Sequence, residues 1–373
     1  MMGEDAESHH WSAASIAQNR HGGRALRAVL KRHPQRGAEL AEVPDPRPGP
    51  GEALLKPVAM GICGTDLHIL DWNPWASARV HPPRVMGHEM AGLVMALGEG
   101  VDDLAVGDLV GVETHVVCGT CPQCLRGDFH VCQRTRILGV DADGAWAELV
   151  ALPGRNCRPA PAGLDPAVIA FQEPMGNAVH AASQGPLRDR VVLVTGCGPI
   201  GLAAVGVAKA EGASRVVAVD RVAARLRIAE EMGADALVDT SRAPDLVPEL
   251  TRACRGTADV VLEMSGHPAL IGAALSVISP GGWVSLLGLG DEDVRIDLST
   301  MVVMRGVTLF GVTGRRQFET WDRTSAYLSS GAVDVRPILT DRVPILEFER
   351  AANLARAGAV GKVILYPPEG EWR

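Results

Sequence analysis

The sequence lacks an excess of basic charge and lacks long apolar runs, and both absences narrow what the protein can be. Its formal net charge is −8, whereas a surface that binds nucleic acid or an anionic membrane is expected to carry a basic excess. No apolar run reaches the length of about 20 residues that a membrane-spanning helix needs. We therefore expect neither a nucleic-acid partner nor a membrane-embedded segment.

The first 24 residues also lack the apolar core of a signal peptide. They are polar, and their paired histidines, His9 and His10, are not expected to bind metal in a disordered tail. We predict a disordered extension over residues 1–24 and a cytoplasmic protein. Without a secretory signal, clustered cysteines are better explained by metal ligation than by a disulfide framework.

What the sequence does have is length and a globular composition. The 373 residues are 47% hydrophobic and 21% charged, which is enough apolar surface for two domains. Residues 25–178 carry short apolar runs cut by glycine, proline and aspartate, the pattern of an antiparallel, barrel-like β unit. Residues 179–320 alternate strand and helix patterns, which predicts a doubly wound parallel sheet in the Rossmann manner. The segment 321–373 is expected to return to the first unit, so the predicted fold class is α/β.

A glycine-rich turn in the second unit predicts a dinucleotide site. A strand pattern precedes the turn, a helix pattern follows it, and Asp220 ends the next strand about 20 residues later. The turn contains Gly196, Gly198, Pro199, Ile200 and Gly201. The glycines let the backbone approach a pyrophosphate, and the start of the helix supplies N–H donors. The alternative is an ordinary strand–helix turn whose glycines serve packing only.

The choice of dinucleotide depends on the acid at the end of the second strand. Asp220 can accept hydrogen bonds from both hydroxyls of an adenosine ribose, and its charge repels a 2′-phosphate, so NAD is favoured over NADP. Arg221 and Arg225 lie close by in the sequence and weaken this preference, because an arginine can bind a 2′-phosphate.

Four cysteines lie close together in a lobe predicted over residues 113–135. They are Cys118, Cys121, Cys124 and Cys132. Four thiolates close a tetrahedral Zn²⁺ site with no open position, which is typical of a structural site. An iron–sulfur cluster is the main alternative, but its usual cysteine spacings differ. A zinc ribbon that binds nucleic acid fits poorly with the acidic charge.

A second metal site is predicted from residues that are separated in the sequence. Catalytic zinc takes about three protein ligands and an exchangeable water. Cys63, His88 and one carboxylate, either Glu89 or Glu173, would supply them. Glu173 lies where the β-rich unit meets the dinucleotide unit, which is where a nicotinamide would arrive.

The motifs CGTDLH, GHE, CGTCPQCLRGDFHVC and GCGPIG together resemble the zinc-dependent medium-chain alcohol dehydrogenases. HILDWNPWA, EPMGNAVH, VLEMSG and GRRQFETW are similar to the threonine dehydrogenase branch of that family. The resemblance spans residues 25–365. It implies a GroES-like catalytic domain beside a Rossmann domain, one catalytic and one structural zinc, NAD, and a homotetramer.

The resemblance also implies roles for single residues. Thr65 matches the hydroxyl that touches the substrate oxygen, and His68 matches the proton-relay histidine. Glu89 and Glu173 match the carboxylates of the catalytic zinc. His115 matches a histidine near the substrate pocket, and Asp220 and Arg225 match contacts to the adenosine ribose.

The implied reaction is the NAD-linked oxidation of a secondary alcohol, with L-threonine converted to 2-amino-3-oxobutanoate. The same machinery acting on a polyol, a diol, a sugar alcohol or another hydroxylated biosynthetic intermediate is the alternative. Taken singly, the residues have structural explanations: His68 as a surface histidine, Thr65 as a turn residue, Asp66 as a helix cap and His115 as support for the cysteine lobe.

Overall fold

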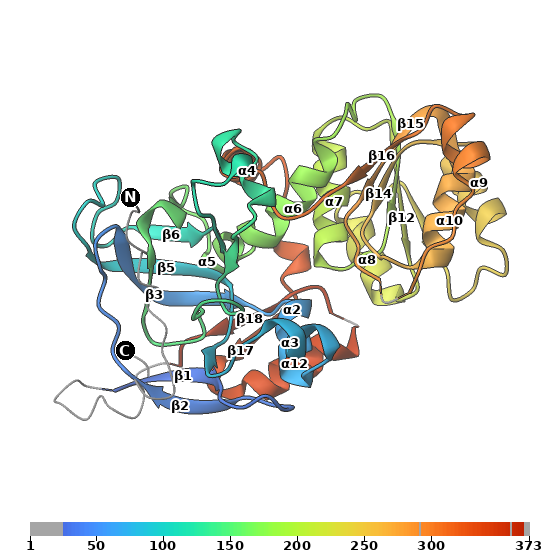
Figure 1. The fold of residues 1–373 in the computed structure, drawn as a ribbon. Coiled ribbons are helices and arrows are strands. Elements are labelled where there is room, and N and C mark those ends of the chain that lie inside the picture. The colour runs from blue at the N-terminus through green and yellow to red at the C-terminus, as the bar shows by residue number, and fades with distance from the viewer. Residues whose placement is uncertain (1–24, 291, 359, 369–373) are drawn as a thin grey trace.

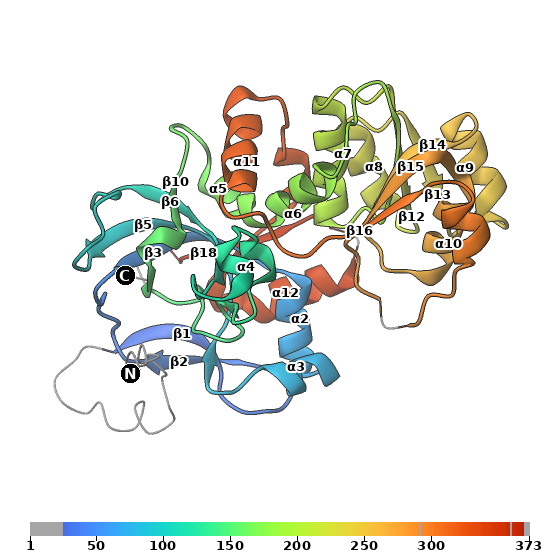
Figure 2. The same ribbon diagram turned by 45° about the horizontal axis from the view of Figure 1, so that its top comes forward.

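The computed structural model describes residues 25–290, 292–358 and 360–368 (Figure 1). The extension predicted over residues 1–24 lies outside this range. The described chain forms a β-rich half and a half with a helix-covered parallel sheet, joined through helix α6 (Figures 1 and 2). No helix in the described ranges combines the length and hydropathy needed to cross a bilayer.

The β-rich half is built around a seven-stranded sheet in the order β10-β6-β5-β3-β18-β17, with β9 also paired to β3. Its strands are β3 (Glu52–Gly61), β5 (Glu89–Leu97), β6 (Leu109–Val112), β9 (Val150–Pro153), β10 (Cys157–Pro159), β17 (Asp341–Pro344) and β18 (Val363–Tyr366). The first seven residues of β3 alternate between buried and half-buried positions, as expected for a strand with one face on the core. Smaller sheets are formed by β1 (Leu26–Lys31), β2 (Glu39–Val43) and β4 (Arg84–Val85), and by β7 (His115–Val116) with β8 (Arg136–Ile137).

The C-terminal segment adds two strands and a helix to this half. Strand β18 pairs antiparallel with β3, so that Ile364 lies opposite Gly61, and β17 pairs parallel with β18. Helix α12 (Phe348–Ala357) packs on the same core through Phe348 and Ala351. The segment around β18 therefore lies beside the strand that leads directly into Cys63.

The second half is a six-stranded parallel sheet in the order β13-β12-β11-β14-β15-β16, the strand order of a Rossmann fold. Its strands are β11 (Val191–Thr195), β12 (Arg215–Asp220), β13 (Ala236–Asp239), β14 (Ala258–Glu263), β15 (Ile278–Leu286) and β16 (Thr308–Gly311). Helices α7 (Pro199–Ala210) and α8 (Ala223–Glu231) cover one face, and α9 (Leu246–Cys254) and α10 (Pro268–Val277) cover the other (Figure 1). The predicted fold class is confirmed. The glycine turn follows β11, where the strand order reverses and ligands bind in such sheets.

Helices α5 (Pro166–Ala170), α6 (Gln172–Ala182) and α11 (Glu319–Ser330) lie between the two sheets (Figure 2). Met175 and Val179 of α6 belong to the same apolar core as Val192 of the parallel sheet. Residue 178, where we predicted one unit to end, lies inside α6. The predicted boundaries 25–178, 179–320 and 321–373 stay predictions.

Two helices follow β3 that the sequence pattern did not predict, α2 (Gly64–Asp71) and α3 (Pro74–Arg79). Helix α2 begins after Cys63, whose backbone N–H donates to the Asp66 carboxylate at 2.9 Å in a capping box. It ends at Trp72, which adopts a left-handed conformation with φ of 53°. The remaining short helical segments are α4 (Pro122–Leu125), η1 (Phe129–Val131), η2 (Gly154–Asn156), η3 (Ser299–Val303), η4 (Arg336–Ile338) and η5 (Ile345–Glu347).

Candidate active site and metal centres

The four clustered cysteines converge in a lobe formed around α4 and η1. The sulfur of Cys118 lies 3.9 Å from that of Cys124 and 3.6 Å from that of Cys132, and the Cys121 and Cys132 sulfurs are 3.9 Å apart. A tetrahedron with Zn–S bonds of about 2.3 Å has edges of about 3.8 Å, whereas a disulfide requires about 2.05 Å. The sulfur positions therefore fit one closed Zn²⁺ site.

Hydrogen-bond donors around this cluster stabilise the thiolate of Cys118, whereas burial raises the pKa of the Cys124 thiol to about 12. The backbone N–H of Cys121 donates to the Cys118 sulfur at 3.4 Å, and the Arg134 guanidinium donates to the same sulfur at 3.4 Å. Hydrogen bonds from the Thr120 and Cys121 backbone and from Arg134 lower the pKa of the Cys118 thiol to about 5. Because the thiolate is the form that binds metal, the lobe is prepared for a cation.

A second group of ligands gathers where β3 ends and β5 begins. The ligand atoms of Cys63, His88 and Glu89 all lie within 4.8 Å of one another. His88 and Glu89 are buried and Cys63 is half-buried, so the set is sheltered but reachable. One sulfur, one imidazole nitrogen and one carboxylate oxygen form the donor set of a catalytic zinc that keeps a further position open.

Asp66 serves both in the capping box of α2 and as a partner of His88. One carboxylate oxygen accepts from the Cys63 backbone, and the other lies 3.5 Å from Nδ1 of His88. Burial acts to lower the pKa of His88, but the charge of Asp66 and hydrogen bonds with Asp66 and Cys63 raise it well above its ordinary value. A carboxylate behind a ligand histidine fixes the orientation of the imidazole.

Glu89 is held by a buried lysine from the C-terminal strand pair. Nζ of Lys362 donates to Oε1 of Glu89 at 2.6 Å, and both side chains are buried. Burial raises the pKa of Glu89, and the charge of Lys362 opposes this effect. A Cβ on Gly61 would lie 1.8 Å from Glu89 Oε2 and 2.9 Å from Lys362 Cε, so only glycine leaves room for this pair.

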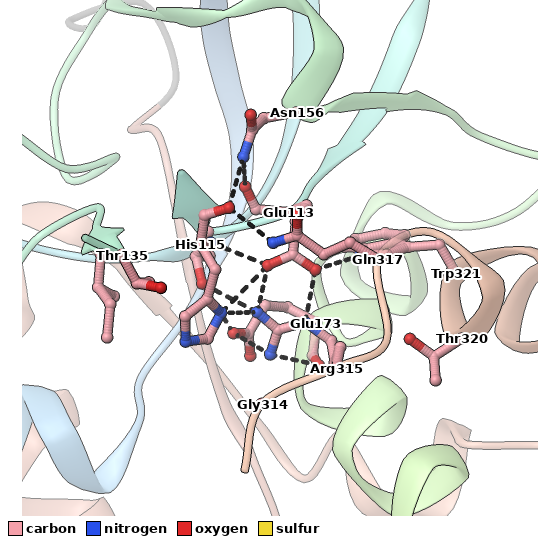
Figure 3. A network of polar contacts seen from close by, with 12 residues as sticks. Glu113, His115, Thr135, Asn156, Glu173, Gly314, Arg315, Gln317, Thr320 and Trp321 are labelled. Atoms are coloured by element: carbon pink, nitrogen blue, oxygen red, sulfur yellow. Dashed lines mark hydrogen bonds and ion pairs between the residues drawn. The ribbon is translucent and has the colours of Figure 1, made fainter. Parts of the chain in front are cut away.

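The structure places Glu173, the other predicted carboxylate ligand, in a different arrangement. Its Oε1 lies 2.7 Å from a guanidinium nitrogen of Arg315 and accepts from the Thr114 hydroxyl at 3.0 Å (Figure 3). Cys63, His88 and Glu89 form the converging set without it. Glu173 is nevertheless near, because its charge contributes to raising the pKa of Glu89.

Arg315 ties Glu173 to a second buried acid, Glu113. The guanidinium donates to the two oxygens of Glu113 at 2.8 and 2.5 Å, and all three side chains are buried (Figure 3). Trp321 also donates its indole N–H to Glu113, at 2.7 Å. Burial alone would raise the pKa of Glu113, but the charge and hydrogen bonds of Arg315 hold it far below its usual value.

The predicted substrate histidine, His115, belongs to this network. A guanidinium nitrogen of Arg315 lies 2.6 Å from its Nδ1, and the backbone N–H of His115 donates to Glu113 at 2.8 Å. Any contact with a substrate would therefore be made by the opposite edge of the ring, at Nε2. The ring also lies near Gly314: a Cβ added to this glycine would lie 3.6 Å from Cε1 of His115.

We expect Glu113→Gln to lower the stability of the protein by about 3 kcal/mol, because it leaves Arg315 buried with one carboxylate partner instead of two. The shift in the midpoint of urea unfolding at pH 7 measures this cost. Asp334→Asn is the matched control, since its pair with Arg336 is exposed and should cost less than about 1 kcal/mol.

The ion pair between Glu113 and Arg315 also predicts how stability depends on pH. The pKa of Glu113 is depressed in the folded state. The ionised carboxylate therefore stabilises the folded protein fully above the pKa of glutamate in the unfolded chain, about 4.3, and this stabilisation is lost as the pH falls below that pKa. The difference in stability between Glu113→Gln and the parent should therefore shrink on acidification below that value. A difference that stays constant as the pH falls from about 4 to about 2 would contradict the ion pair.

The two residues predicted to pass on a proton lie on α2. The Cys63 sulfur is 3.8 Å from the Thr65 hydroxyl, which places that hydroxyl beside the candidate metal ligands. His68 follows three residues later, so both side chains project from neighbouring positions on one helix face. His68 is exposed, and its Nδ1 lies 2.9 Å from the Asn73 amide nitrogen.

The glycine turn has the shape that a dinucleotide requires. Gly196 adopts φ of +88°, and a Cβ there would meet the Ser265 backbone at 2.9 Å, while a Cβ on Gly201 would lie 1.8 Å from the Gly196 carbonyl oxygen. A Cβ on Gly198 would meet nothing within 4 Å, so the space next to this glycine, which leads into α7 through Pro199 and Ile200, can receive a pyrophosphate.

Asp220 stands at the end of β12, as predicted, and braces the same turn. One of its oxygens accepts from the Cys197 backbone N–H at 2.7 Å and the other from Val222 at 2.8 Å. Arg225 lies on α8, and its guanidinium approaches Gly358 near the end of α12. The acid that is predicted to bind a ribose thus also holds the glycine turn in place.

Sequence reasoning missed Glu113, Arg315 and Lys362 as parts of the site. Arg315 and Trp321 lie in the motif GRRQFETW, but nothing in that motif indicates their partner. Glu113 and Arg315 are 202 residues apart in the chain, so no local pattern could reveal the ion pair. A charged residue that follows an apolar strand, as Glu113 does, is the only available signal.

Comparison with known proteins supports this arrangement. A family model described as the alcohol dehydrogenase GroES-like domain matches residues 49–162, and one described as zinc-binding dehydrogenase matches residues 199–330. The chain is 44% identical over 339 residues to an L-threonine 3-dehydrogenase of Pyrococcus furiosus, a match that covers 90% of this chain and 97% of that protein.

Solved structures agree in fold. An alcohol dehydrogenase from Escherichia coli CFT073, solved with NADH, superposes with a TM-score of 0.84 at 28% identity. A zinc-binding dehydrogenase from Sinorhizobium meliloti 1021, solved with NADP, superposes with a TM-score of 0.84 at 29% identity. Each match covers 92% of this chain and 100% of the other.

Proposed function

This chain belongs to the zinc-dependent medium-chain alcohol dehydrogenases, and on that premise we propose that it oxidises the 3-hydroxyl of L-threonine to give 2-amino-3-oxobutanoate, with NAD⁺ as hydride acceptor. The observation that carries the choice of substrate is the 44% identity over nine-tenths of the chain with L-threonine 3-dehydrogenases. The converging set of Cys63, His88 and Glu89 supports the type of chemistry.

When bound, Zn²⁺ polarises the substrate hydroxyl as a Lewis acid, and the nicotinamide accepts the hydride. Thr65, beside Cys63, is positioned to accept the hydroxyl proton and to pass on its own. His68, one helical turn further along α2 and exposed, delivers a proton to solvent. The metal would be held by Cys63, His88 and Glu89, with Glu173 kept next to them by Arg315.

A substrate screen that follows NADH absorbance tests this proposal. L-Threonine should give turnover well above that of 2,3-butanediol and sorbitol. The opposite ranking, with a diol oxidised and threonine inert, would assign the same machinery to a polyol. Metal analysis should find two zinc ions per chain; a single zinc would leave only the cysteine lobe occupied.

We expect Asp220→Ala to raise the KM for NAD⁺ about tenfold, because a charge-assisted hydrogen bond to the ribose is worth roughly 1.5–3 kcal/mol. Discrimination against NADP⁺ should fall at the same time, since the repulsion of a 2′-phosphate is removed. Initial rates with both cofactors measure the two effects. Asp220→Asn is the control for the brace to Cys197 and Val222, because an amide keeps one acceptor oxygen while losing the charge. Unchanged cofactor preference in both variants would mean that the ribose contact is wrongly assigned.

We also propose that the protein acts in the cytoplasm as a homo-oligomer, with a tetramer as the implied size. Strand β16 is the edge of the parallel sheet, and the segments around it expose large apolar side chains. Leu289 is 96% exposed, Met304 81% and Val303 72%. A second copy of the chain would cover these side chains, and light scattering of the purified protein tests this.

A further inference from the structure

Asn73 lies between helices α2 and α3 and bonds to both of them. Its Oδ1 accepts from the Ala76 backbone N–H at 2.9 Å, which makes Asn73 the N-cap of α3. Its own backbone N–H donates to the His68 carbonyl at 3.2 Å. Its side-chain nitrogen Nδ2 lies 2.9 Å from Nδ1 of the His68 ring.

The cap bond determines which end of the amide faces the histidine. If Oδ1 and Nδ2 exchanged places, the amide NH₂ would point at the Ala76 N–H, and two donors would face each other. Nδ2 carries only donor hydrogens, so the Nδ1 atom of His68 must act as the acceptor in this pair. A neutral imidazole that accepts at Nδ1 carries its proton on Nε2.

We propose that Asn73 is a positioning residue for His68, which holds the ring in place and fixes its neutral form as the Nε2–H tautomer. This rests on the proposed function, in which His68 is the last member of the proton relay. A proton that arrives at Nδ1 breaks the bond to Asn73, because both atoms would then be donors. The bond to Asn73 forms again once the ring has passed a proton to solvent and Nδ1 is again an acceptor.

No other group among the described residues is placed to determine which nitrogen of His68 carries the proton. Among the described residues, histidine ion pairs involve His88 and His115, so no carboxylate stands within ion-pair distance of His68. The ring of Trp75 lies 6.2 Å away, centroid to centroid, at an angle of 57°, and offers no acceptor to Nδ1. Asn73 is thus the group that decides which nitrogen of His68 carries the proton.

The test uses two substitutions that keep the helix cap. Serine and aspartate both cap helices as well as asparagine does, so Asn73→Ser and Asn73→Asp should leave the thermal midpoint nearly unchanged. Asn73→Ser removes the amide N–H donor and shortens the side chain. Asn73→Asp replaces the donor by a charged acceptor, which favours a proton on Nδ1 and stabilises the charged ring.

Two measurements follow. Solid-state NMR of ¹⁵N-histidine-labelled full-length enzyme, with His68→Gln to identify the signal, should show Nε2–H in the parent and Nδ1–H in Asn73→Asp. In the same variant the acid limb of the pH dependence of kcat/KM should move upward by about one pH unit. A tautomer and a pH profile that are unchanged in Asn73→Asp would overturn the proposal.

The outcome for His68→Gln separates this inference from the function on which it rests. A loss of about a hundredfold or more in kcat/KM is expected if the histidine relays protons. Full activity of His68→Gln would refute the relay and with it the catalytic purpose of Asn73, whereas the NMR signal would still decide the assignment of the tautomer. A shift of the pH profile in Asn73→Asp that persists in the double variant with His68→Gln would also overturn the proposal.

Discussion

Replacing Cys63 by serine should lower kcat/KM by about a thousandfold or more while the protein stays folded. The substitution removes the sulfur from the converging set with His88 and Glu89, and several kcal/mol of charge stabilisation in the transition state disappear with the metal. The fold should survive because the interaction of Cys63 that matters for α2 is made by its backbone N–H, which donates to Asp66.

Three measurements on purified Cys63→Ser check this expectation. The zinc content should fall from two ions per chain to one, the rate of NADH formation should approach background, and the thermal midpoint should change little. Full activity in this variant would reject Cys63 as a ligand. A large loss of stability would instead show that the site at Cys63, like the cysteine lobe, maintains the fold.

Replacing Cys124 by serine should have the opposite signature, a loss of stability of more than about 4 kcal/mol. Its sulfur lies 3.9 Å from that of Cys118 in a closed set, and the lobe around it is small, with its buried side chains being mainly the cysteines themselves. Binding of metal to such a site supplies folding free energy directly, so its removal unfolds the lobe.

The control for Cys124→Ser is Cys254→Ser. Cys254 is a buried thiol in the apolar core of the parallel sheet, away from both metal sets. Its substitution should cost no more than an ordinary polar replacement, about 1–3 kcal/mol. Urea midpoints, the yield of folded protein and the zinc content distinguish the two. Equal losses in both variants would argue against a structural metal.

The glycine turn and the cysteine lobe could be predicted because each is written within a short stretch of chain. The strand, turn and helix around Gly196 follow in direct succession, and Cys118 to Cys132 span 15 residues. The Rossmann strand order follows for a similar reason, because alternating strands and helices with short connections restrict the topology to few solutions.

The helices α2 and α3 were not predicted because the sequence pattern that indicates a helix is weak in both. Helix α2 has eight residues and α3 has six, too few for an apolar period to stand out, and the N-cap position of α2 is a cysteine rather than a common cap residue. Proline at the start of α3 and Asn73 before it are the usual signals of a helix start, yet inside the motif ILDWNPWA they read equally well as a loop.

The sequence by itself determined the fold class, and it was enough to predict the donor types of the two ligand sets and the dinucleotide turn, because these depend on residue type and on spacing along the chain. Only the tertiary structure decided which carboxylate joins Cys63 and His88. Glu89 and Glu173 are equivalent as ligands in chemical terms, and their different positions come from Lys362 and Arg315, cations brought from distant segments. A buried charge takes the orientation in which its partners are nearest, and those partners are set by packing between the two halves of the molecule.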